Sequence, residues 1–260
     1  MNCSLKKQIV IAIIQARMGS KRLPGKTTTL VAGKPLLVHI IERIKASKTI
    51  DRIVLATTDS PEDDVLEKLA SENAISCYRG STNDVLDRFY QAADTFGADI
   101  IVRITADDPF KDPDLLDFCV CYLLEHPHLD YVSNTLKPTY PEGLDIEVFR
   151  FGALKKAWKS ASLPSEREHV TPFIWKNPEL FSCANIESPE DLSGYRWTID
   201  YEDDLHFTRE IYEKLKDKGI FHMQDILDLL KKYPYLTKLN KAHPRNAGYL
   251  KSLKEEMKNV

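Results

Sequence analysis

Four cationic side chains follow the first apolar segment of the chain within ten residues. They come after residues 9–15, which have the composition of a buried strand, and they are Arg17, Lys21, Arg22 and Lys26. Gly19 and Gly25 interrupt the same stretch, and glycine lets a backbone approach a ligand closely. A strand, a basic glycine-bearing loop and a helix are typical of phosphate sites in α/β proteins. The stretch therefore predicts a polyanion site, although it matches neither the Walker A nor the dinucleotide fingerprint.

Acidic side chains follow two other predicted strands. Asp107 and Asp108 come after residues 100–105, and Asp200 comes after residues 195–199. Ligands bind open α/β sheets outside the carboxyl ends of the strands, and Mg²⁺ is commonly held by one or two carboxylates together with phosphates. Asp107 and Asp200 are therefore predicted to hold one or two Mg²⁺ ions beneath the phosphates. A simple turn accounts for the Asp-Asp-Pro sequence equally well.

Side chains suited to a sugar lie further along the chain. Asp145 and Glu147 share one face of a predicted strand, where they would accept hydrogen bonds from sugar hydroxyls or simply face solvent. Arg167 suits a carboxylate or a phosphate. His169 suits a hydroxyl, although a lone histidine in an amphipathic helix is more often structural. These four residues and Arg103 are the predicted substrate-binding residues.

A turn between a strand and a helix is the predicted seat of the base or the ribose. It contains Arg79, Gly80 and Ser81. Asp84 suits the N-cap of the helix that follows, and Arg88 would either bind the nucleotide or pair with Asp84 one turn earlier. The predicted nucleotide-binding residues are Gln15, Ala16, Arg17, Gly19, Ser20, Arg22, Lys26, Arg79, Gly80, Ser81 and Arg88.

Strands and helices alternate along the part of the chain that carries these groups. Apolar runs predict strands at residues 9–15, 53–57, 75–78, 100–105, 131–134, 144–149, 180–186 and 195–199. Helical spacing predicts helices at residues 35–46, 61–73, 84–96, 112–125, 151–160, 166–176, 203–218 and 223–232. The alternation predicts an α/β fold with a doubly wound, mainly parallel sheet.

A single domain is expected to span residues 1–240. Its predicted pattern changes after residue 130, where an inserted substrate or dimerisation subregion is expected at residues 131–175. Residues 241–260 form a polar, lysine-rich tail, which we expect to be a peripheral helix or partly disordered.

The composition excludes several classes of protein. The 260 residues carry 36 basic and 39 acidic side chains, so the formal net charge of −3 gives no global attraction to nucleic acid. No run approaches the roughly 18 apolar residues that span a bilayer, and the first residues lack the apolar core of a signal peptide. The five cysteines are scattered, as in a reduced, cytoplasmic protein. No partner of the nucleic-acid or membrane class is therefore expected.

The motifs together resemble one family. They lie at residues 14–26, 33–36, 79–81, 84–88, 102–107, 143–147, 167–171 and 197–200. In this order they resemble the cytidylyltransferases that activate acidic sugars, which include the CMP-sialate and CMP-3-deoxy-manno-octulosonate synthetases. Within that family they look most like the spore-coat polysaccharide biosynthesis subgroup. Ala106 departs from the glycine usual in the subgroup, and its methyl group is acceptable only if its φ is negative.

The resemblance implies a fold, a reaction and site residues. It implies a Rossmann-like nucleotidyltransferase fold in which Arg17 and Lys26 contact the CTP phosphates and Asp107 and Asp200 hold Mg²⁺. The turn at residues 79–81 would lie near the cytosine and ribose. Residues 131–175 would contribute to the sugar pocket and to a homodimer interface.

The resulting hypothesis is nucleotidyl transfer. A hydroxyl of an acidic, 2-keto-3-deoxy type sugar attacks the α-phosphorus of CTP and pyrophosphate leaves, with Arg17, Lys26, Asp107 and Asp200 as the catalytic residues. The product would serve the synthesis of a surface polysaccharide or glycan. One alternative is a nucleotidyltransferase that acts on a phosphorylated sugar, an alcohol or a phosphonate. A second is a nucleotide-binding regulatory protein without turnover.

Overall fold

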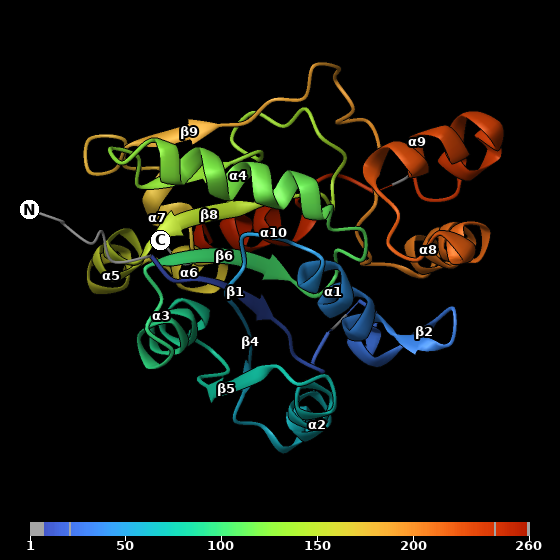
Figure 1. Ribbon diagram of the computed structural model, residues 1–260. Helices are drawn as coiled ribbons and strands as arrows, with labels where there is room; N and C mark the ends of the chain where they lie inside the picture. The colour runs from blue at the N-terminus through green and yellow to red at the C-terminus, as the bar shows by residue number, and fades with distance from the viewer. Residues whose placement is uncertain (1–7, 21, 242, 259–260) are drawn as a thin grey trace, which may run out of the picture.

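The computed structural model describes residues 8–20, 22–241 and 243–258, and its centre is a seven-stranded sheet (Figure 1). The strands lie in the order β5-β4-β1-β6-β8-β7-β9. Their bounds are β1 Val10–Gln15, β4 Arg52–Thr58, β5 Ser76–Gly80, β6 Ile100–Thr105, β7 Tyr131–Ser133, β8 Glu147–Arg150 and β9 Cys183–Asn185. A separate two-stranded sheet joins β2 Leu30–Val31 to β3 Lys34–Pro35.

The sheet is mainly parallel, as predicted. Strand β1 pairs in parallel with β4 on one side and with β6 on the other, and β4 pairs in parallel with β5. Only β8 runs against its neighbours β6 and β7, and β9 continues in parallel from β7. The chain leaves β1 toward β4 and later returns to β6. A topological switch therefore lies at the carboxyl ends of β1 and β6, where ligands bind in such sheets.

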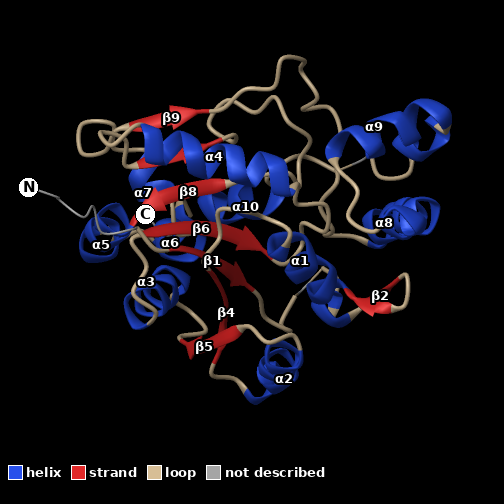
Figure 2. Ribbon diagram, viewed as in Figure 1, coloured by secondary structure: helices blue, strands red, loops and turns tan. Residues whose placement is uncertain are grey.

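Helices cover both faces of the sheet (Figures 1 and 2). On the near face lie α1 Leu36–Lys45, α2 Asp64–Glu72 and α4 Pro113–Glu125; on the far face lie α3 Val85–Thr95, α5 Phe151–Ser160, α6 Pro164–His169 and α7 Pro172–Trp175. The alternation of side chains in a strand divides the core accordingly. Ala12 and Ile14 join a cluster with α1 and α4, whereas Ile11 and Ile13 join one with α3 and α5.

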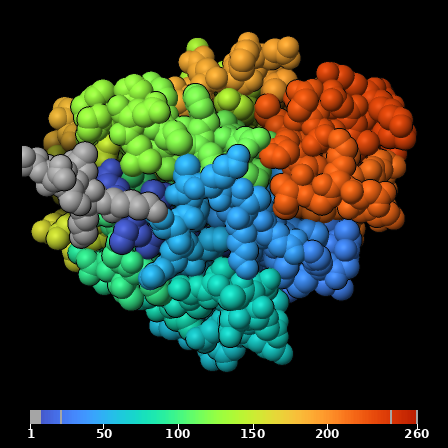
Figure 3. All heavy atoms as spheres, viewed as in Figure 1, coloured from blue at the N-terminus to red at the C-terminus, as the bar shows by residue number. Residues whose placement is uncertain are grey.

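The carboxyl-terminal part of the chain forms a further group of helices. Its elements are α8 Glu202–Leu215, α9 Met223–Lys232 and α10 Ala247–Glu256. Short 3₁₀ turns are η1 Lys26–Thr28, η2 Pro61–Asp63, η3 Lys216–Lys218 and η4 Pro234–Lys238. The space-filling view shows the segments of α1 and α4 over the sheet on the near face, beside those of α8 and α9 (Figure 3). Among the residues that the structure describes, no helix has the length and apolar character to cross a membrane.

Side-chain caps fix the starts of the helices that border the site. The Asp84 carboxylate accepts the N–H of Asp87 at the start of α3, at 2.9 Å. Asp112 accepts the N–H of Asp114 at 3.0 Å at the start of α4, where Pro113 has no N–H to satisfy. The two capped helices follow the loops that leave the carboxyl ends of β5 and β6.

The predicted elements differ from the structure after residue 140. No strand forms at residues 195–199; this stretch makes a single bridge between Glu142 and Arg196. Strand β8 begins only at Glu147. The predicted helix at 166–176 breaks at Val170, whose φ is 72°. Pro172 contributes to the break, because it has no N–H with which to continue the hydrogen bonds of α6, and it begins α7 as that helix's first residue.

Candidate active site

Two adjoining cavities open at the carboxyl ends of β1 and β6. The larger has a volume of about 500 Å³ and contains much of the basic loop after β1, so we call it the nucleotide cavity. The smaller, of about 340 Å³, lies beside β8 and α7, and we call it the acceptor cavity. Both are lined by Arg22, Arg103, Asp107, His169 and Asp200. A substrate in one cavity therefore meets a substrate in the other at these residues.

The nucleotide cavity is basic. Eight of the predicted nucleotide-binding residues line it, namely Gln15, Ala16, Arg17, Gly19, Ser20, Arg22, Lys26 and Arg88. Arg88 is buried, and its Nε has no hydrogen-bond partner within the described part of the chain. Burial and then the charge of Arg17 lower the pKa of Arg88 to about 10. Two cations that repel each other in this way are suited to an anion between them.

Lys26 lies between the two predicted metal ligands. Its Nζ donates to the Asp107 carboxylate at 2.9 Å, to the Asp200 carboxylate at 3.1 Å and to the carbonyl of Ile199 at 2.7 Å. Burial alone would lower the pKa of Lys26, but the two carboxylates outweigh the effect of burial, so the pKa of Lys26 is raised. All three ammonium hydrogens are engaged, so a contact with phosphate requires that one of these bonds be exchanged.

The contact with Lys26 stabilises the ionised form of Asp107. Burial alone would raise the pKa of Asp107, but the Lys26 ammonium lowers it to about 2. Ala106, directly before it, does not have a positive φ, so its methyl group is compatible with the backbone.

Asp200 is positioned by Arg22, from the loop after β1, and by two residues near it in the chain, Arg196 and Asp204. Arg22 approaches its carboxylate at 2.5 Å and Arg196 at 3.6 Å. Asp204, in the first turn of α8, accepts the backbone N–H of Asp200 at 2.9 Å and that of the N-cap residue Tyr201 at 3.1 Å. The carboxylate that caps the helix thus also orients the aspartate before it.

The two carboxylates fit a divalent cation. Asp107 follows the end of β6 and Asp200 lies in the loop before α8, and the two carboxylates already share one positive charge, that of Lys26. Mg²⁺ is commonly held by one or two carboxylates together with substrate phosphates. The site therefore has the donor chemistry that the predicted Mg²⁺ requires.

The acceptor cavity is lined by carboxylates that are themselves paired. Glu147 bonds to Arg103, accepts the Tyr131 hydroxyl at 2.7 Å and accepts the Thr171 hydroxyl at 2.5 Å. Burial would raise the pKa of Glu147, but Arg103 lowers it. Asp145 accepts a bond from Arg245 at 2.7 Å. Sugar hydroxyls would therefore meet a charged, rigid surface in which Asp145 is the more open group.

Two of the predicted arginines, Arg167 and Arg79, do not line either cavity. Arg167 donates to the Asp84 carboxylate and, at 2.8 Å, to the carbonyl of Trp158, so it joins α6 to the start of α3. Arg79 turns toward α2, where it contacts Asp64 at 2.6 Å and Glu67 at 2.9 Å. Carboxylates at the start of α3 and on α2 thus engage the two arginines, which are structural and do not face a substrate.

The rest of the 79–81 turn also lies outside the two cavities. Ser81 accepts the N–H of Asp84 with its hydroxyl and a bond from Arg88 with its carbonyl, at 3.1 and 2.8 Å. Gly80 continues β5. The turn therefore contributes to the nucleotide cavity by holding the guanidinium of Arg88 through the Ser81 carbonyl. The ion pair between Arg88 and Asp84, which their spacing on the helix allows, does not form.

His169 lies at the boundary of the two cavities, where it bonds to the Ser252 hydroxyl at 3.0 Å. Burial, and then the charge of Arg103, lower the pKa of His169 to about 4. The imidazole is therefore neutral at pH 7, which suits a hydrogen bond and does not supply a cation for a carboxylate.

The free energy of unfolding should report this neutral histidine. Between pH 4 and 6.5 the unfolded chain binds a proton at His169 and the folded chain does not, so stability falls as the pH is lowered through this window. Urea unfolding at several pH values should show a flatter pH dependence for His169→Gln than for the wild type. If the free energy of unfolding changed equally with pH in the two proteins, the lowered pKa of His169 would be contradicted.

The carboxyl-terminal segment also lines the cavities, which the sequence did not indicate. It contributes Asn246, Ala247, Gly248, Tyr249, Lys251, Ser252 and Glu255. Residues 241–260 had been expected to lie at the periphery. Their weak amphipathic pattern carries no signal of this position, because the contacts are made by small and polar side chains.

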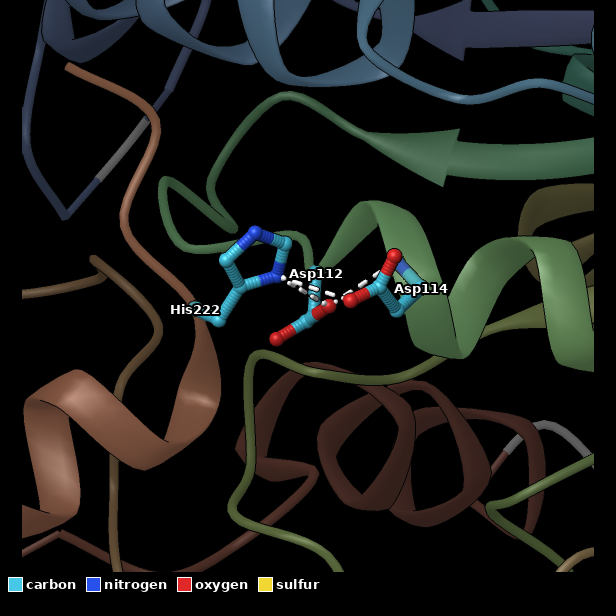
Figure 4. Close-up of side chains that lie close together, drawn as sticks. All are labelled: Asp112, Asp114 and His222. Carbon is cyan, nitrogen blue, oxygen red and sulfur yellow. Dashed lines mark hydrogen bonds and ion pairs between the residues drawn. The ribbon is translucent and has the colours of Figure 1, made fainter.

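One cluster with metal-ligand chemistry lies outside the cavities. Asp112, Asp114 and His222 converge where the chain enters α4 and α9 (Figure 4). The Asp112 carboxylate already accepts the N–H of Met223 at 2.6 Å as well as the cap bonds of α4. Its contact with His222, at 3.2 Å, completes a junction of two helix starts. The cluster is thus accounted for by structure.

Comparison with known proteins identifies the family. The model of the family described as cytidylyltransferase matches residues 11–239, which include the strands of the main sheet from the second residue of β1 onward and both Asp107 and Asp200. The chain belongs to this family. It is therefore a CTP-dependent nucleotidyltransferase, and the resemblance read from the motifs is confirmed.

Relatives of this cytidylyltransferase cover most of its length. It is 33% identical over 233 residues to the spore coat polysaccharide biosynthesis protein SpsF of Bacillus subtilis, covering 86% of this chain and 95% of the relative. It is 32% identical over 204 residues to a 3-deoxy-manno-octulosonate cytidylyltransferase of Desulfatibacillum aliphaticivorans, covering 74% and 76%. A cytidylyltransferase structure from Leptospira borgpetersenii superposes with a TM-score of 0.87 at 34% identity, covering 92% and 100%.

Proposed function

We propose that the enzyme transfers CMP from CTP to an acidic sugar of the 2-keto-3-deoxy type and releases pyrophosphate. The observation that carries the proposal is the junction of a basic cavity with a second cavity across Asp107 and Asp200. The relatives named for 3-deoxy-manno-octulosonate and for spore coat polysaccharide support the class of acceptor and a role in surface glycan synthesis.

The residues suggest how the reaction would proceed. The triphosphate would lie along the loop after β1, where Arg17 and Arg88 face the nucleotide cavity. An acceptor hydroxyl would attack the α-phosphorus from the acceptor cavity, and the bond to the bridging oxygen of the leaving pyrophosphate would break. Arg17 and Lys26 would then stabilise the negative charge that builds on the leaving group.

The proposed Mg²⁺ would be held by Asp107 and Asp200. When bound, it neutralises phosphate charge and lowers the pKa of a hydroxyl. Arg22 and Arg103, which line both cavities, are the cations near which the carboxylate of the acceptor would lie. Arg103 also contacts Gln15 at 3.4 Å, at the end of β1.

A substrate panel tests the proposal. The four nucleoside triphosphates, with Mg²⁺, are combined with acidic 2-keto-3-deoxy sugars, neutral sugars and sugar phosphates, and pyrophosphate release is measured. We expect release with CTP and an acidic sugar only. Release with sugar phosphates but not with acidic sugars would overturn the proposed acceptor.

A homodimer in the cytoplasm is proposed for the working enzyme. The support is the resemblance, which assigns an interface to residues 131–175, where the apolar side chains of Leu136 and Leu163 are exposed. The described cysteines are free thiols, in keeping with a reducing compartment. Light scattering of the purified enzyme tests the dimer, and a monomeric mass at micromolar concentration would overturn it.

A further inference from the structure

The carboxyl-terminal segment, residues 245–256, forms one wall of both cavities although it lies beyond the part of the chain that the family model matches. That match ends at residue 239. Tyr249 and Asn246 line the acceptor cavity, and Lys251 and Ser252 line the nucleotide cavity. The segment is thus placed where it can contact substrates directly.

Specific contacts hold this wall in place. Arg245 bonds to Asp145 at 2.7 Å, and the N–H of Asn246 donates to Glu142 at 2.8 Å. Further along α10, the Ser252 hydroxyl donates to Glu168 at 2.7 Å and bonds to His169. The Glu256 carboxylate accepts the N–H of Ser165 at 3.1 Å. Both ends of the segment are therefore anchored, to the β8 side and to α6.

Lys251 is the cation that this wall presents to the nucleotide cavity. It faces the same space as Arg17, from the loop after β1, and Arg88, from α3. Its ion pair with Glu255, at 3.6 Å, joins two side chains that are each about three-fifths exposed. Such pairs are weak, so Lys251 is free to exchange this partner for a phosphate.

We propose that Lys251 binds the phosphates of CTP and that α10 completes the nucleotide site. This inference rests on the proposed use of CTP. A triphosphate carries several negative charges, and cations from three separate elements would surround it once α10 is docked. The segment is then part of the substrate-binding machinery and not a peripheral tail.

Paired charge reversals test the assignment. Lys251→Glu is compared with Lys254→Glu, which changes an exposed lysine of the same helix that lines neither cavity. Binding of CTP with Mg²⁺, without acceptor, is measured by titration calorimetry. We expect Lys251→Glu to weaken binding about tenfold or more, because a phosphate contact is lost and a like charge replaces it. Lys254→Glu should bind like the wild type.

Salt and melting temperature separate a direct contact from a structural effect. The loss of CTP affinity in Lys251→Glu, relative to the wild type, should be smaller at high ionic strength, because screening weakens an interaction between charges. The milder Lys251→Gln, with an unchanged melting temperature, should lie between wild type and Lys251→Glu. Equal CTP affinity of the two glutamate variants would overturn the assignment and leave the proposed function standing. A wild type that does not bind CTP would overturn both.

Discussion

Lys26→Met should abolish turnover while leaving the fold intact. We expect the rate of pyrophosphate release to fall by about 10²–10³-fold or more, the range found when one preorganised electrostatic contact is removed. Methionine keeps the length of the side chain but leaves Asp107 and Asp200 without the ammonium that lies between them. The measurement is pyrophosphate release at saturating CTP and acceptor.

A matched lysine controls for the loss of charge. Lys34→Met removes a half-exposed lysine of the β2–β3 hairpin, whose ammonium pairs with the Glu42 carboxylate at 2.6 Å. It should retain wild-type turnover. Because Lys26 also lowers the pKa of Asp107, the pKa of that carboxyl should rise in Lys26→Met, where burial then dominates. Wild-type turnover in Lys26→Met would show that the ammonium has no part in the reaction.

Gly143→Ala should destabilise the enzyme severely. Gly143 has a φ of 101°, and a methyl group there would lie 2.6 Å from the carbonyl carbon of Trp197 and 2.7 Å from the nitrogen of Thr198. The backbone cannot yield easily, because Glu142 exchanges hydrogen bonds with Tyr195 and Trp197 on either side. We expect the free energy of unfolding to fall by about 3 kcal/mol or more, from backbone strain and overpacking together.

Urea unfolding measures this effect against Gly194→Ala. Gly194 lacks a positive φ, and nothing lies within 4 Å of the position of its added methyl group. That variant should be within about 0.5 kcal/mol of the wild type, as is usual at open surface positions. Similar stability of Gly143→Ala and Gly194→Ala would contradict the close approach. The close approach of Gly143 to Trp197 also fixes the loop that carries Asp145 against the loop that carries Asp200, and both aspartates line the acceptor cavity.

The sequence predicts the parts of this fold that depend on local patterns. The apolar runs and capped helices up to residue 125 specify strands and helices that the structure confirms, and parallel βαβ units have one favoured handedness. The basic loop after β1 and Asp107 after β6 converge because the carboxyl ends of parallel strands share one edge, whereas Asp200 reaches that edge from a loop and not from a strand. The nucleotide side of the site was therefore predictable in outline.

Long-range partners account for what the sequence could not indicate. From the sequence, both Arg167 and Arg79 have the chemistry of substrate ligands. In the structure, Asp84 pairs with Arg167, and a carboxylate of α2 pairs with Arg79. Similarly, residues 195–199 are apolar because Trp197 and Ile199 are buried in the core, not because they form a strand. The small and polar residues of α10 give no periodic signal, yet they line both cavities.

The fate of the phosphates in a single reaction shows which phosphorus of CTP the acceptor attacks. Wild-type enzyme, CTP, Mg²⁺ and an acidic 2-keto-3-deoxy sugar are followed by phosphorus NMR. We expect equal amounts of pyrophosphate and of a CMP-sugar with one phosphodiester signal. Formation of CDP and a sugar phosphate, or of orthophosphate alone, would contradict this expectation, because attack would then have occurred at another phosphorus.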